Sequence, residues 1–309
     1  MNKTENSLTA EEMQIFNELM KQRKAFAEDN LKKCLDKLWA ENQIIHKAMT
    51  YAIYNGGKRI RPILVFEGAA IAGADRQKVA PAACAMEMIH CYSLVHDDLP
   101  AMDDDDFRRG KPACHKVFGE DIAILAGDAL LTGAFEVLAA LPCKNEDERL
   151  RLLQVIGEIA AAAGSAGMVS GQVIDLKSEG QQIDHVALQN LHYLKTGKLF
   201  LASLRAGAIL GGLEPTGLQK LTEYVENFGL AFQITDDILD VVGDELEIGK
   251  PIGSDEKNLK TTYPSLFGLD KARQLAEETV RVCIDSLEGF GAEADFLRYL
   301  AGYLLSRSS

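Results

Sequence analysis

The feature that most constrains this chain is a run of acids at the end of an apolar segment. Six of the ten residues from Asp97 to Asp106 are aspartates, and Arg108 and Arg109 follow almost at once. Two carboxylates about 4 Å apart repel by roughly 4 kcal/mol at an effective dielectric near 20. A folded chain must therefore leave such a cluster in water or neutralise it with cations. Residues 85–95 are apolar and helix-compatible, which favours acids at the end of a buried element over a solvated acidic loop.

A second acidic cluster has the same setting. Asp236, Asp237 and Asp240 directly follow the apolar run 228–235. Asp236 and Asp240 are four residues apart, so they share a face of an undistorted helix. This cluster needs no break in the helix to present two carboxylates together.

The first cluster does need a break. On a straight helix Asp97 and Asp103 would point about 120° apart. Pro100 lies between them and disturbs a helix, because it has no N–H group and its ring clashes with the preceding turn. We expect a kink or loop at Leu99 and Pro100 that can bring Asp103 back beside Asp97.

Net charge, cysteine content and hydropathy limit the binding partners and the cellular location that we expect for the protein. The net charge of −13 argues against a nucleic-acid or anionic-membrane partner. The six cysteines form no C-x-x-C pair, which favours the reduced thiols of a cytoplasmic protein over a disulfide framework or a zinc site. The N-terminus lacks the apolar core of a signal peptide. We also expect no membrane span, since residues 159–169 are too few and too rich in glycine.

Hydrophobic periodicity predicts helices along nearly the whole chain. We expect helices within residues 1–50, over 80–95, 122–141, 150–176, 188–210 and 221–242, and two more from 264 to about 305. No period-2 segment of strand length, internal repeat or linker interrupts them. The 309 residues, 47% of them hydrophobic, can bury a large core. The pattern therefore predicts one all-α domain over residues 1–309, a single large helical bundle with a central cavity.

One break between predicted helices forms a basic turn. Residues 55–62 contain two glycines, then Lys58 and Arg61, and end in a proline that suits a helix start. Free N–H groups at a helix start favour anions, so a phosphate site competes here with a plain solvated turn. His90 lies seven residues before Asp97, on nearly the same helix face. A lone helical histidine is usually structural, and only its position beneath the acids makes it a candidate.

Two further breaks carry cations. Lys195 and Thr196 precede a glycine inside the predicted helix 188–210, and this interruption either aims both side chains at a ligand or is a surface kink. The polar loop 249–260 carries Lys250 and Lys260 and suits a flap over a site.

Taken together, these elements predict the type of reaction that the protein catalyses. Two aspartate clusters roughly 140 residues apart can face each other across a bundle cavity. Oxygen-only ligands suit Mg²⁺, which is usually shared with substrate phosphates. Arginine and lysine side chains fit a diphosphate, and an apolar shaft beneath the acids would hold a hydrocarbon tail. The residues indicate an enzyme that ionises a diphosphate-bearing lipid precursor with the help of a metal.

At this level of detail the chain resembles the trans-isoprenyl diphosphate synthases, in particular the bacterial-type farnesyl diphosphate synthases, over nearly its whole length. One aspartate motif alone is weak evidence, whereas five blocks in the family's order are very specific. These blocks are Gly56-Gly57-Lys58-Arg59-x-Arg61-Pro62, Asp97-Asp98-x4-Asp103 with Arg108-Arg109, Lys195-Thr196-Gly197, Phe232-Gln233 and Asp236-Asp237-x2-Asp240.

The resemblance implies the isoprenoid synthase fold and a prenyltransferase that is a homodimer, while the cysteine pattern favours a cytoplasmic location. Such an enzyme condenses isopentenyl diphosphate with dimethylallyl and geranyl diphosphate to give (2E,6E)-farnesyl diphosphate by magnesium-assisted ionisation and head-to-tail 1'-4 coupling. The metals and cations stabilise the departing pyrophosphate, and an allylic carbocation remains. The final proton goes to the bound pyrophosphate, so no side-chain base is required.

The resemblance also implies roles for individual residues. About three Mg²⁺ ions per active site would be held by Asp97, Asp98, Asp103, Asp236, Asp237 and Asp240. The residues central to catalysis would be Asp97, Asp103, Lys195 and Asp236. The allylic diphosphate would contact Arg108, Lys195, Thr196, Gln233, Lys250 and Lys260. Isopentenyl diphosphate would contact Lys58, Arg61, His90 and Arg109.

Product length depends on the floor of the shaft. Tyr92 and Ser93 lie roughly 6–7.5 Å down the helix from Asp97, where a bulky side chain in the family blocks chain growth. This pair predicts a C15 product, unless Tyr92 is ordinary core and another helix sets the length. The alternatives are a geranylgeranyl (C20) synthase, a terpene cyclase, which would lack the Lys58 and Arg61 site, and a non-catalytic partner subunit or acidic metal-binding scaffold, which degraded motifs would favour.

Overall fold

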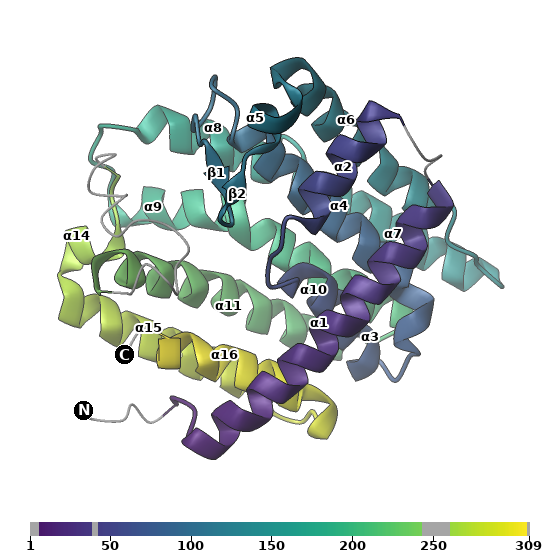
Figure 1. The fold of residues 1–309 in the computed structure, drawn as a ribbon. Helices are drawn as coiled ribbons and strands as arrows, with labels where there is room; N and C mark the ends of the chain where they lie inside the picture. The colour runs from purple at the N-terminus through teal and green to yellow at the C-terminus, as the bar shows by residue number, and fades with distance from the viewer. Residues whose placement is uncertain (1–5, 39–42, 243–259, 308–309) are drawn as a thin grey trace.

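The computed structural model describes residues 6–38, 43–242 and 260–307, and Figure 1 shows that helices dominate it. The longer helices are α1 (Ala10–Leu38), α2 (Ile44–Tyr54), α3 (Ile60–Ile71), α4 (Ala80–Asp97), α6 (Glu120–Ala139), α7 (Glu146–Ala163), α8 (Met168–Ser178), α9 (His185–His192), α10 (Lys198–Gly211), α11 (Pro215–Val242), α15 (Leu269–Ser286) and α16 (Asp295–Arg307). Shorter elements are α5 (Cys114–Phe118), α14 (Tyr263–Phe267), the 3-10 turns Arg76–Val79 and Ala292–Ala294, the π-helical turn Tyr193–Gly197, and the strands β1 (Phe107–Arg108) and β2 (Lys111–Pro112). The predicted all-α fold is confirmed.

The helices pack around a central set formed by α3, α4, α10 and α11. In Figure 1, α11 lies between α10 and the pair α15 and α16, while α1 crosses the front of the bundle. Helices α3 and α10 cross closely, because both present glycine there. A Cβ atom on Gly68 would lie 2.2 Å from the Leu204 carbonyl oxygen, and one on Gly207 would lie 1.8 Å from that of Val65.

The buried apolar side chains form one contiguous core. It runs from Phe16 in α1 to Leu305 in α16 and includes Tyr224, whose hydroxyl donates to the Leu297 carbonyl oxygen at 2.8 Å. A charged group also lies inside it. Glu67 is 0% exposed and accepts hydrogen bonds from two arginines, one of them Arg23 at 2.9 Å. The pairing satisfies a carboxylate that would otherwise be costly to bury.

Near residue 264 the structure has the short helix α14 in addition to the two predicted helices, and two further differences in secondary structure lie elsewhere. The predicted helix over 150–176 is two helices, because the chain turns at Gly164–Gly167 between α7 and α8. A Cβ atom on Gly167 would lie 2.1 Å from the Ala162 carbonyl oxygen, so this turn requires glycine. The second difference is the antiparallel pair of β1 with β2, in register Phe107 to Pro112. Two-residue strands are too short for a period-2 pattern, which is why none was predicted.

Other predicted helix boundaries agree more closely with the structure. The interruption expected inside helix 188–210 is the π-helical turn Tyr193–Gly197. Within the predicted helical region 1–50, α1 begins with a capping box, in which Thr9 and Glu12 each donate a backbone N–H to the other's side chain. The last helix ends at Arg307, two residues later than expected.

Two apolar stretches bear on the prediction that no run could span a membrane. By length and composition, Glu120–Ala139 and Glu146–Ser178 both could, so the prediction is wrong by that criterion. The second stretch is broken between α7 and α8, and α6 packs along α4. A helix packed in a globular core passes the same test, so one or two such stretches are weak evidence for a membrane.

Candidate active site

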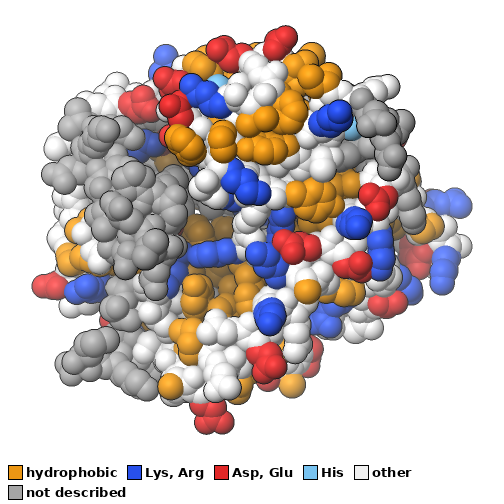
Figure 2. All heavy atoms as spheres, viewed as in Figure 1, with side chains coloured by type: hydrophobic (Ala, Val, Ile, Leu, Met, Phe, Trp, Pro, Cys, Tyr) orange, Lys and Arg blue, Asp and Glu red, His pale blue; other side chains and the backbone are white. Residues whose placement is uncertain are grey.

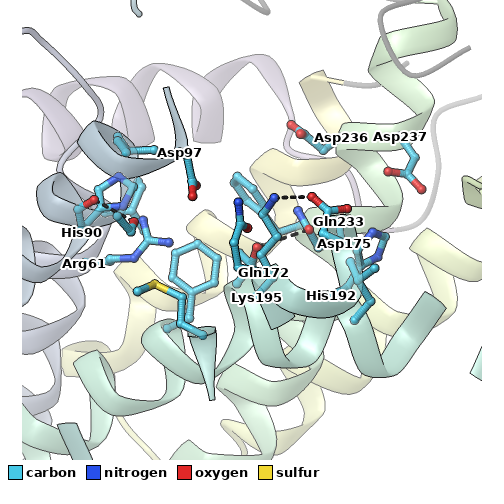
Figure 3. Close-up of a pocket in the computed structure, with 18 of the residues that line it drawn as sticks. Arg61, His90, Asp97, Gln172, Asp175, His192, Lys195, Gln233, Asp236 and Asp237 are labelled. Atoms are coloured by element: carbon cyan, nitrogen blue, oxygen red, sulfur yellow. Dashed lines mark hydrogen bonds and ion pairs between the residues drawn. The ribbon is translucent and has the colours of Figure 1, made fainter. Parts of the chain in front are cut away.

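A cavity of about 1270 Å³ brings distant parts of the chain together. Figure 2 shows Lys and Arg side chains around a hollow near the centre of one face, with apolar side chains deeper inside. Figure 3 shows Asp97, His90 and Arg61 on one side and Lys195, Gln233 and Asp236 on the other. The predicted site residues that line this cavity are Lys58, Arg61, His90, Tyr92, Ser93, Asp97, Arg109, Lys195, Thr196, Gln233, Asp236, Asp237 and Lys260.

Asp97 is the last residue of α4 and faces the cavity. After it the chain turns through Pro100, and the backbone N–H of Asp103 donates to the Asp97 carbonyl oxygen at 2.9 Å. The expected return of Asp103 toward Asp97 is therefore present. Burial raises the pKa of the Asp97 carboxyl to about 7, with Lys195 opposing the shift and Asp103 adding to it. The fold thus holds Asp97 where its charge is poorly compensated.

Asp98 and Arg108 do not line the cavity. Asp98 is 2% exposed, and its Oδ1 accepts a hydrogen bond from Arg108 Nε at 2.8 Å. Arg108 also donates to Asp105 Oδ2 at 3.0 Å. Burial raises the pKa of Asp98, while Arg108 opposes that shift. The β1–β2 hairpin directs Arg108 back onto Asp98, so the two neutralise each other in this conformation.

The second cluster lies on the unbroken helix α11. Asp236 lines the cavity with a side chain that is 55% exposed. Asp237 also lines it, and its Oδ2 accepts the backbone N–H of Tyr263 at 2.9 Å. Asp240 is 9% exposed and is not part of the lining, nor is Asp103 of the first cluster. Of the six predicted metal ligands, three therefore face the cavity directly.

The basic turn before α3 is built on two glycines. Gly56 and Gly57 have φ angles of +97° and +116°, which residues with side chains rarely adopt. A Cβ atom on Gly57 would also lie 2.6 Å from the Arg109 guanidinium. Arg59 turns inward and pairs with the buried Glu87 at 2.5 Å. Because Arg59 is held inside, the turn leaves its other cations for the cavity.

Those cations surround a half-buried histidine, His90. Burial lowers the pKa of Arg61 to about 10, and its guanidinium lies 4.8 Å from the centre of the Phe200 ring. Burial, together with Arg61 and Arg109, holds the pKa of His90 well below its usual value. Arg109 Nη2 and His90 Nε2 are 3.4 Å apart. A neutral imidazole between two cations can act as a hydrogen-bonding partner for an anion bound there.

The π-helical turn supplies the opposite wall. Lys195 Nζ lies 2.5 Å from Asp175 Oδ2, and Lys260 Nζ lies 3.6 Å from the same oxygen. Burial alone would raise the pKa of Asp175, but these two ammonium groups lower it. Beside them, Thr196 Oγ1 donates to Gln233 Oε1 at 3.3 Å. The turn therefore aims a lysine and a hydroxyl at the same volume.

Three residues of the site were missed by the sequence reasoning. Asp175 lines the cavity and accepts a hydrogen bond from Lys195. His192 lines the cavity, and burial lowers its pKa to about 4. Arg307 lies 3.7 Å from Asp236 and stacks on the Phe232 ring. No local motif marks the last two. Lys250 and the rest of the expected flap before Lys260 lie outside the described residues.

The donor set facing the cavity fits a hard divalent cation. Asp97 and Asp236 offer carboxylate oxygens, the ligand type that Mg²⁺ prefers. Burial raises the pKa of Asp97 because it withdraws the carboxylate from water, and Lys195 only partly offsets that cost. A divalent cation would supply further positive charge.

Comparison with known proteins yields consistent matches. Residues 42–297 match the polyprenyl synthetase family. The chain is 42% identical over 293 residues to a farnesyl diphosphate synthase of Geobacillus stearothermophilus, covering 94% of this chain and 97% of that one. It is 45% identical over 269 residues to the heterodimeric geranylgeranyl pyrophosphate synthase large subunit 1 of Arabidopsis thaliana, covering 86% and 72%. The crystal structure of an FPP/GFPP synthase from Zymomonas mobilis superposes with a TM-score of 0.81 at 39% identity, covering 94% and 98%.

Proposed function

The chain belongs to the polyprenyl synthetase family, and from that premise we propose that it makes (2E,6E)-farnesyl diphosphate from isopentenyl diphosphate and the allylic starters dimethylallyl and geranyl diphosphate. It is a trans-prenyltransferase, as the farnesyl diphosphate synthases among its relatives are. The observation that carries the proposal is one cavity lined by Asp97 and Asp236 together with two separate groups of cations.

In this proposal the allylic diphosphate lies between Asp97 and Asp236. When bound there, about three Mg²⁺ ions would neutralise the diphosphate and favour its departure. Lys195 and Lys260 lie on that side and stabilise the leaving group further. Thr196 and Gln233 offer hydrogen bonds to the same substrate. Asp98, Asp103, Asp237 and Asp240 complete the proposed ligand set, with Arg108 and Lys250 as further substrate contacts.

The isopentenyl diphosphate binds the other group of cations. Lys58, Arg61, His90 and Arg109 line one side of the cavity and leave the centre free for the apolar part of the substrate. Its double bond then attacks the allylic carbocation head-to-tail. Since the proton lost afterwards goes to the departed pyrophosphate, none of these side chains needs to act as a base.

The product assay tests this function. The protein is incubated with Mg²⁺, isopentenyl diphosphate and either dimethylallyl or geranyl diphosphate, and the dephosphorylated alcohols are separated by chromatography. We expect farnesol. Geranylgeraniol would instead support the alternative function, a C20 synthase. Relatives such as the geranylgeranyl diphosphate synthase of Cyanophora paradoxa support that alternative. No prenyl alcohol with either starter would overturn the proposal.

We assign the floor of the shaft to Tyr92, with Ser93 beside it. Tyr92 is 7% exposed, lines the cavity and packs edge-on to His96 at 5.7 Å between ring centres. Replacing Tyr92 with Ala opens space below Asp97, so we expect C20 or longer products from the same assay. Tyr54→Ala removes a 38%-exposed tyrosine outside the lining and keeps the C15 product. If Tyr92→Ala still makes the C15 product, residues of another helix form the floor of the shaft.

We further propose that the protein is a cytoplasmic homodimer in which residues 1–309 act as one domain. Apolar side chains left exposed on neighbouring elements support a partner surface: Val117, Ile124, Leu125, Leu150 and Leu153. The six cysteines, which all lie in the described residues, are thiols and form no disulfide, and this supports a reducing compartment. Light scattering after size exclusion should give twice the chain mass, and Leu125→Glu should reduce it. A monomeric wild-type protein would reject the dimer.

A further inference from the structure

A second group of metal-ligating side chains lies outside the cavity. One ligand atom each from Asp104, Asp106 and His115 lies within 4.8 Å of the other two. None of the three belongs to the cavity lining. They are also distinct from the six aspartates assigned above to the diphosphate centre, although Asp104 follows Asp103 directly in the chain.

The histidine of this group is the observation that points to a ligand. His115 is 6% exposed, so its ring is almost wholly withdrawn from water. Within the part of the chain that the structure describes, neither ring nitrogen has a hydrogen-bond partner. Buried polar atoms are nearly always paired, so such a ring requires an explanation. A cation shared between this imidazole and two nearby carboxylates would provide one.

The three side chains come from the two ends of one hairpin. Asp104 and Asp106 precede β1, and His115 lies in the first turn of α5, three residues after β2 ends. The Ala113 backbone N–H donates to the Asp106 carbonyl oxygen at 2.8 Å and closes the hairpin at the same place. The hairpin carries Arg108 and Arg109. An ion bound here would therefore join its two ends.

A lysine already neutralises part of this group. Lys116 Nζ lies 2.6 Å from Asp106 Oδ1, and both side chains are exposed, by 42% and 61% respectively. An exposed ion pair of this kind is weak and can exchange for a stronger cation. Lys116 is thus a competitor that an arriving ion displaces.

We propose that Asp104, Asp106 and His115 form a second divalent-metal site, which takes a transition-metal ion such as Zn²⁺ or Mn²⁺ and fastens the hairpin that carries Arg108 and Arg109. One imidazole nitrogen with two carboxylates suits these ions, whereas Mg²⁺ prefers oxygen ligands alone. Metal–ligand bonds of about 2.0–2.2 Å require the ligand atoms to approach to about 3–4 Å. The two exposed carboxylates can move the remaining ångström, and water completes the coordination.

Pulsed electron paramagnetic resonance of bound Mn²⁺ tests the site, because only a nitrogen ligand produces ¹⁴N modulation. Metal-free protein receives excess Mg²⁺ to occupy the oxygen-only centre, then one equivalent of Mn²⁺. We expect ¹⁴N modulation that Zn²⁺ abolishes by displacement. Absence of modulation, or modulation that persists in His115→Gln, would overturn the proposal.

Exposed ligands and a matched control keep the test independent of folding. Asp104→Asn and Asp106→Asn alter exposed side chains, and each should weaken Mn²⁺ binding by at least about tenfold. Asp147→Asn removes an exposed carboxylate elsewhere and should leave binding unchanged. Lys116→Ala should tighten binding by roughly two- to fivefold, because the competing ammonium is gone. Equal affinities across all four variants would place the Mn²⁺ elsewhere and reject the site.

Discussion

The two aspartate clusters reach the same cavity by different structural means. The second lies on the uninterrupted α11, so helical spacing alone sets the direction of Asp236. The first begins at the last residue of α4, Asp97, and its later members depend on the turn that follows. The second cluster is thus a local property of a helix, whereas the first is a property of a turn and of the side chains that hold it.

The two clusters also differ in how far their ion pairs with arginine are withdrawn from water. Arg108 and Asp98 are buried together, with side-chain exposures of 17% and 3%. Arg307 approaches Asp236 at 3.7 Å, but that carboxylate is 55% exposed. A pair withdrawn from water is sensitive to the loss of either partner, whereas an exposed carboxylate remains hydrated. The first cluster should therefore depend on its arginine more than the second does.

The greatest loss of activity should follow the removal of a cavity-facing carboxylate from either cluster. Asp97→Asn and Asp236→Asn each remove a carboxylate that faces the cavity, so each should lower kcat/KM for farnesyl diphosphate formation by about 10³-fold. Steady-state assays with saturating Mg²⁺ measure this. The control Asp270→Asn changes an exposed carboxylate on α15 and should retain activity. If only one of the two variants loses activity, the clusters do not act together.

The next effect separates the clusters by stability. Arg108→Ala leaves the buried Asp98 without its partner, so we expect the free energy of unfolding to fall by about 3 kcal/mol. Arg307→Ala leaves Asp236 hydrated, but it also removes hydrogen bonds to the Phe232 carbonyl oxygen and to Thr235 Oγ1, so the loss should be about 2 kcal/mol. Urea unfolding of the metal-free protein compares them.

Arg149→Ala is the control for that comparison. Its pair with Glu146 is exposed by 64% and 72%, so the stability should stay within a few tenths of a kcal/mol of the wild type. Equal losses for Arg108→Ala and Arg307→Ala would remove the distinction between a cluster held by an ion pair and one held by a helix.

The smallest effect concerns pH and the first cluster. The pKa of Asp97 is raised from its usual 3.8 to about 7 in the folded protein. Its contribution to stability is therefore full below pH 4 and is lost as the pH rises through 7. After allowance for solvent screening at a half-buried group, we expect metal-free wild type to lose about 1–2 kcal/mol over that range relative to Asp97→Asn. If the free energies of unfolding of the two proteins change with pH in the same way, the raised pKa of Asp97 is contradicted.

Much of the fold was predictable because its signals are local. Helical periodicity, the glycines of the basic turn and the spacing of Asp236 and Asp240 act within a few residues, and the structure bears out the corresponding helices and turn. The β1–β2 hairpin and the turn at Gly164–Gly167 were missed, since neither leaves a periodic pattern. The family resemblance is confirmed by the match over residues 42–297.

Most of the helices and the charged residues at their ends follow from the order of residues in the chain, because near neighbours decide backbone hydrogen bonding and side-chain periodicity. Packing in three dimensions is needed to bring Lys195 to Asp175, Arg108 to Asp98 and Arg307 to Asp236. These pairs depend on how helices distant in the chain pack. Burial, which sets the pKa of Asp97, likewise exists only once that packing has removed water.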